Sequence, residues 1–144
     1  MKPLTFSEEV KDQQLNTVNV ALTNSKYPVS GSFIDVGNYE RFVIRMAGGS
    51  MPDAVVAQIE QATAANGTPK DITGAVQTFA DDNEVREIEV LVNKLDINNG
   101  YRYITVDVTG VSGSDYASLE FFGILPNSQP VTQPDSFDAV LIES

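Results

Sequence analysis

The sequence of 144 residues contains no cysteine, no histidine and no tryptophan. Without cysteine, the chain forms no disulfide bond and no thiolate metal site. Without histidine, it lacks the commonest general base and the commonest zinc ligand, so an enzyme would have to use carboxylates, lysine or tyrosine. No apolar run approaches the length of a membrane span, so we expect no membrane contact. The first residues lack the apolar stretch of a signal peptide, and none is predicted.

Positive charge is also scarce. The chain has 9 Lys+Arg against 20 Asp+Glu, which gives a net charge of −11. A surface this acidic repels phosphate backbones, so we expect no nucleic-acid binding. No lysine or arginine follows Arg102, although six acidic residues do. This acidity suits a basic partner surface, or it simply keeps the protein in solution.

Alternating apolar residues between positions 84 and 109 are the clearest structural signal. The apolar positions are 88, 90 and 92 in one run and 104, 106 and 108 in the next. A period of two in both runs predicts two strands, each with one face for a core. The segment DINNG at 96–100 accepts turn conformations, so we expect the two strands to form an antiparallel hairpin.

The same reasoning predicts further short strands between Gly, Asn and Pro turns. Residues 54–62 also have a helix-favouring composition, but their alternation and their neighbours favour a strand. The last strand has apolar side chains on both faces, which predicts a central or doubly covered position. We predict an all-β single domain of about eight strands, folded as a β-sandwich, jelly roll or small barrel. The domain is expected at residues 17–126, between an N-terminal arm (1–16) and a C-terminal tail (127–144). The further strands are expected at 17–23, 32–36, 39–46, 54–62, 71–79 and 116–125.

Two acidic segments are candidate reactive or metal sites. Asp81, Asp82 and Glu84 could supply paired carboxylates for acid/base work on a glycosidic bond, although a solvated turn has the same composition. Asp96 and Asn98 resemble the start of a calcium loop, but Gly100 stands where a ligand is needed and no closing glutamate follows. We therefore predict no catalytic residue, no metal site and no cofactor.

Partner binding is predicted at two places. Tyr101 and Tyr103, with Tyr116 or Phe122, could form an aromatic platform for a sugar or a protein, although cross-strand aromatic pairs also stabilise sheets. The tail has a polar, proline-interrupted segment and then an apolar end, which must dock on its own domain, on a sister subunit or on another protein. Its apolar residues are Phe137, Val140, Leu141 and Ile142.

Several segments together resemble a known family. They are 33–37 (FIDVG), 44–48 (IRMAG), 56–61 (VAQIEQ) followed by 71–73 (DIT), 94–96 (KLD) and 101–106 (YRYITV). This pattern resembles the small β-rich structural proteins encoded near the major capsid gene of tailed bacteriophages, a group that includes capsid decoration, or cement, proteins. The similarity covers roughly residues 30–126, and the matching segments are strand patterns without a chemical signature.

The resemblance implies a non-enzymatic virion protein of barrel or jelly-roll type. Proteins of this kind commonly sit as trimers on the outer surface of the head, where they bind the major capsid protein and stabilise the shell. The same group of genes includes tail-tube and head-completion subunits, which are the first alternative. A carbohydrate-binding β-sandwich module and a hydrolase that uses the acidic segment 81–84 are alternatives from other classes.

Overall fold

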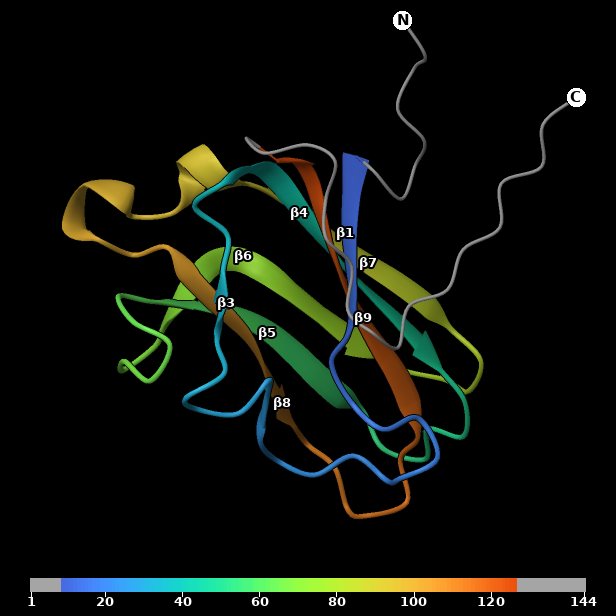
Figure 1. Ribbon diagram of the computed structural model, residues 1–144. Helices are drawn as coiled ribbons and strands as arrows, with labels where there is room; N and C mark the ends of the chain where they lie inside the picture. The colour runs from blue at the N-terminus through green and yellow to red at the C-terminus, as the bar shows by residue number, and fades with distance from the viewer. Residues whose placement is uncertain (1–8, 127–144) are drawn as a thin grey trace, which may run out of the picture.

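The computed structural model describes residues 9–126, which form two antiparallel β-sheets packed face to face (Figure 1). Sheet A has the strand order β1-β9-β4-β7, and sheet B has the order β2-β8-β5-β6 with β3 also paired to β8. The chain is therefore all-β, as predicted, with a sandwich architecture. The strands are β1 (Val10–Gln14), β2 (Lys26–Tyr27), β3 (Ile34–Asp35), β4 (Tyr39–Gly48), β5 (Val55–Ala62), β6 (Lys70–Phe79), β7 (Val85–Leu91), β8 (Tyr103–Thr109) and β9 (Ala117–Pro126).

The core lies between the sheets and is built by every second residue of each strand. On β4 these residues are Phe42, Ile44 and Met46, all fully buried. Ile104 and Val106 of β8 are equally buried in the opposite sheet. The inward face of each strand is thus apolar, as period-two alternation requires, and the two faces together exclude water from the domain centre.

The predicted hairpin at 84–109 is wrong, although both of its strands exist. Strand β7 pairs with β4 in sheet A, whereas β8 pairs with β5 in sheet B. Two 3-10 turns, η1 (Val92–Lys94) and η2 (Ile97–Asn99), carry the chain from one sheet to the other. Alternation shows which side of a strand faces the core, but it does not identify the neighbouring strand, and here the two apolar faces meet across the core.

The predicted strand at 17–23 is also wrong. Val18 and Val20 are 53% and 57% exposed, and the backbone N–H of Val20 donates to the Thr17 carbonyl in a turn. Of the apolar residues in this segment, Leu22 alone is buried. Strand β1 lies earlier, within the predicted arm. The predictions for 39–46, 54–62, 71–79 and 116–125 are confirmed by β4, β5, β6 and β9, while 32–36 contains only the short β3.

A wide bulge interrupts the pairing of β5 with β6. Gln58 lies opposite Val76, and Glu60 lies opposite Asp71, so one residue of β5 faces four of β6. The side-chain amide nitrogen of Gln58 donates to the carbonyl oxygens of Ile59, Ile72 and Ala75 at 2.9, 3.0 and 3.2 Å. This amide therefore replaces part of the ladder of hydrogen bonds that the bulge breaks.

Candidate functional site

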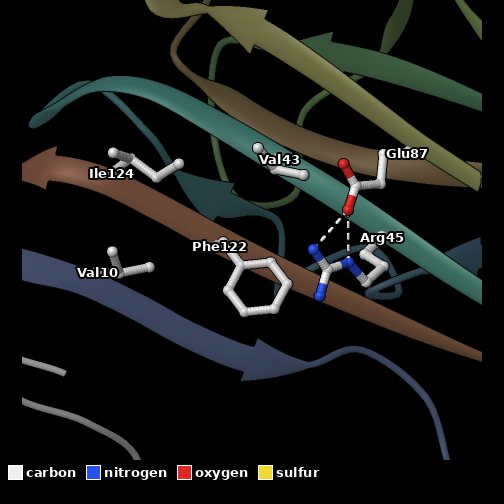
Figure 2. A pocket seen from close by; sticks show the side chains of 6 residues that line it. All are labelled: Val10, Val43, Arg45, Glu87, Phe122 and Ile124. Carbon is white, nitrogen blue, oxygen red and sulfur yellow. Dashed lines mark hydrogen bonds and ion pairs between the residues drawn. The ribbon is translucent and has the colours of Figure 1, made fainter. Parts of the chain in front are cut away.

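A shallow apolar pocket lies on the outer face of sheet A, on the side away from the core. Figure 2 shows its lining side chains rising from the four strands of the sheet. The apolar part is formed by Val10 of β1, Val43 of β4, and Phe122 and Ile124 of β9, which we call the sheet A patch. The pocket has a volume of about 160 Å³. An apolar patch on the outer face of a sheet is unusual, because that face normally carries polar side chains.

The strand register brings the patch together. Val43 lies directly opposite Phe122, and Val10 lies directly opposite Ile124. Cross-strand neighbours on one face are close enough to pack against each other, so four residues distant in sequence form one surface. Val43, Phe122 and Ile124 are half-buried, whereas Val10 is buried, with 6% of its surface exposed, so the exposed part of the patch lies on β4 and β9. The double apolar pattern of β9 signalled this surface, whereas Val10 stands in a polar segment that gives no such signal.

Paired charges border the patch. The guanidinium of Arg45 bonds Glu87 of β7, with 2.6 Å between Nε and Oε1, and lies 5.4 Å from the centre of the Phe122 ring (Figure 2). Arg41 forms a second ion pair with Glu89, at 3.2 Å. An apolar centre with a polar border is the usual anatomy of a protein interface. Because these charges neutralise each other, a partner needs no counter-charge for them.

An acidic pair occupies the same face. The pKa of Glu120 is raised to about 7, chiefly by burial and also by the hydrogen bond and charge repulsion from Asp12, while Arg45 acts in the opposite direction. Glu120 lies on β9 and Asp12 on β1. Near neutral pH the Glu120 carboxyl is therefore partly protonated, which lowers the negative charge beside the patch.

The predicted aromatic residues lie elsewhere. Tyr103 is in β8 of sheet B, and Tyr101 precedes that strand beneath Lys70, whose ammonium is 4.0 Å from the ring centre. Phe122 is in sheet A, so the structure does not place it beside the two tyrosines. Tyr116 precedes β9 and is exposed. The four apolar tail residues, Phe137, Val140, Leu141 and Ile142, lie outside the described residues.

The acidic segment 81–84 stabilises a turn. The Oε1 atom of Glu84 accepts the backbone N–H groups of Asp81 and Ala80, both at 2.8 Å, and these bonds lower the pKa of Glu84. Asp82 accepts the N–H of Met51 at 2.6 Å. Two of the three carboxylates are thus engaged with the backbone. None of the three lines the pocket on sheet A.

The segment 96–100 is likewise occupied by internal contacts. Asp96 binds the Lys70 ammonium at 2.8 Å and accepts the Asn99 side-chain amide at 2.8 Å. Lys70 is the main cause of the lowered pKa of Asp96. Gly100 closes the turn in the left-handed conformation, with φ of 84°. Within residues 9–126, no three acidic side chains are grouped so that they could hold a metal ion.

Comparison with known proteins yields only distant similarity of fold. No family model matches the sequence, and no curated protein matches it. The structure is similar to that of the SPBc2 prophage-derived protein YomS, with 11% identity, a TM-score of 0.49, and coverage of 86% of this chain and 99% of that one. It is also similar to the coat protein of Tobacco streak virus, with 13% identity, a TM-score of 0.43, and coverage of 94% and 95%. Between residues 9 and 126, no helix is long and apolar enough to cross a membrane.

Proposed function

We propose that this chain is an auxiliary structural protein of a tailed-phage virion, a capsid decoration protein that binds the major capsid protein on the outer surface of the head. The observation that carries the proposal is the sheet A patch, an apolar surface with a border of paired charges, which suits assembly. The resemblance of residues 30–126 to small phage structural proteins supports the same assignment.

The contacts of the acidic residues favour binding over catalysis. Glu84 and Asp82 accept backbone hydrogen bonds, and Asp96 pairs with Lys70. A general acid or base needs a free position beside a substrate pocket. Carboxylates that stabilise turns do not supply one, so a hydrolase is the weaker candidate.

Stabilisation of the head would follow from mass action. A protein that binds only the assembled shell shifts the equilibrium toward the shell by its binding free energy. A stable interface buries roughly 1,200–2,000 Å² in total, far more than one small patch offers. A homotrimer would add further contacts, because several subunits bound together gain avidity even when each one binds weakly.

The experiment is co-sedimentation of the full chain with purified mature phage heads, followed by electron microscopy of heads with and without it. We expect saturable binding at a fixed number of copies per capsomer, with extra density on the outer surface. Density confined to the tail tube or to the portal end would instead identify a tail-tube or head-completion subunit. Absence of binding to any part of the virion would refute the proposal.

A further inference from the structure

We propose that the sheet A patch receives residues 137–142 from the C-terminal tail of a second copy of this chain. This inference rests on the proposed function and deepens it, because it names the contact that joins the subunits of the decorating oligomer. Two of the four patch residues lie on β9, and the tail follows that strand directly in the chain, so every subunit carries both halves of the contact.

The two surfaces are chemically matched. The patch offers one phenyl ring and three branched aliphatic side chains, and the tail offers the same kinds of group in Phe137, Val140, Leu141 and Ile142. In an extended segment, Phe137 and Leu141 point to the same side, where they could cover the pocket together, while Asp138 points to the opposite side. Arg45 and Glu87 already neutralise each other at the border. With Asp138 on the side of the segment away from the patch, burial of the side that carries Phe137 and Leu141 leaves no charge without a partner.

The length of the tail distinguishes a neighbour from the same chain. Ile124 and Phe122 are two and four residues before Pro126, so these patch residues lie roughly 7 and 13 Å from the end of β9 at roughly 3.3 Å per residue. Residues 127–136 contain Pro130 and Pro134 and no glycine, and this sequence predicts an extended spacer. Ten extended residues span roughly 33 Å. A spacer that stays extended would place the apolar segment farther from β9 than its own patch is, and within reach of the patch on an adjacent subunit.

A contact of this kind joins two different surfaces, so it is head-to-tail. Head-to-tail contacts close into a ring when the rotation between subunits permits, and otherwise they extend into filaments. A decorating oligomer with a fixed number of subunits requires the closed form. A ring of three would agree with the trimer that the sequence resemblance implies.

Disulfide cross-linking tests the contact directly, because the natural chain has no cysteine. One full-length variant carries Val43→Cys and another carries Leu141→Cys, and the two are mixed under mild oxidation. We expect a covalent dimer that contains one copy of each variant. The matched control replaces Val43→Cys with Val76→Cys, at an exposed valine of sheet B, and should give no dimer.

A chain that carries both Val43→Cys and Leu141→Cys separates the two arrangements. Linked oligomers support the proposal, whereas an internal disulfide within single chains would overturn it, as would the absence of any cross-link. Native mass spectrometry of the Val43→Arg and Leu141→Asp variants should show monomers, whereas the Val76→Arg control should remain oligomeric. Thermal unfolding of each variant checks that it is folded. Co-sedimentation of the wild-type chain with heads is scored separately, so a cross-linked oligomer that binds no head refutes the proposed function alone.

Discussion

Gln58 allows a direct test of whether side-chain hydrogen bonds stabilise the bulge between β5 and β6. Its side-chain amide donates to three carbonyl oxygens, those of Ile59, Ile72 and Ala75. Gln58→Met keeps the length of the side chain but removes both N–H donors. A hydrogen bond contributes about 0.5–1.5 kcal/mol net, so the loss of two full bonds predicts a destabilisation of about 2 kcal/mol. For a domain of this size, that corresponds to a fall in Tm of roughly 6–10 °C.

The measurement is urea unfolding followed by circular dichroism, with thermal unfolding as a second reading. Gln58→Glu should destabilise the protein more than Gln58→Met at pH 7, because a carboxylate would then face three carbonyl oxygens. Gln77→Met is the control: this amide donates one bond, to the Glu87 carbonyl at 3.2 Å, and accepts one from Arg86 at 3.3 Å, and a smaller loss is expected because both bonds are long. A loss below about 0.5 kcal/mol for Gln58→Met would refute the idea that the amide supports the bulge.

Three further predictions concern single contacts. The folded pKa of Glu120 is about 7 against an ordinary 4.5, so the free energy of unfolding should fall as pH rises between these values. Glu120→Gln should abolish this dependence and add about 1 kcal/mol of stability at pH 8, after allowance for solvent screening. An unchanged pH profile of urea unfolding in this variant would contradict the prediction. Gly123→Ala should lower Tm measurably, because the new Cβ would lie 2.6 Å from the Tyr39 ring. Gly113→Ala is the comparison variant, because Gly113 has a positive φ but open space around it, so its effect on Tm measures backbone strain without a clash. Thr105→Val should lower the free energy of unfolding by about 1 kcal/mol, because the fully buried hydroxyl donates to the Pro28 carbonyl at 2.7 Å. Equal stability of the variant and the wild type would show that this bond makes no net contribution.

The sequence predicted the facing of most strands but not their pairing. The alternation within residues 39–46 predicts Phe42, Ile44 and Met46 as one apolar set, and these residues are buried on β4. The hairpin prediction failed because Ile88 and Val106 face the same core from opposite sheets. A local pattern contains no information about which sheet a strand joins. That choice depends on contacts between residues far apart in sequence.

The candidate surface was partly predictable for the same reason. Phe122 and Ile124 alternate with the buried Leu119 and Phe121 along β9, and this pattern correctly indicated a central strand. Val43 was placed in the outward set of its strand, but its contact with Phe122 follows only from the register. Tyr101 illustrates the opposite limit, because its position under Lys70 depends on where strand β6 begins, which composition does not reveal.

The position of the patch in the sheet constrains what can cover it. Strand β9 is flanked by β1 and β4, so its backbone groups are already paired and an added strand could not bond to it. A partner must therefore bind through side chains, across the face of the sheet. Arg45 and Glu87 satisfy each other, which leaves burial of apolar surface as the main source of affinity. A short segment with one apolar side meets these conditions, and residues 137–142 of a neighbouring chain supply one, because Phe137 and Leu141 alternate with their single charged residue, Asp138.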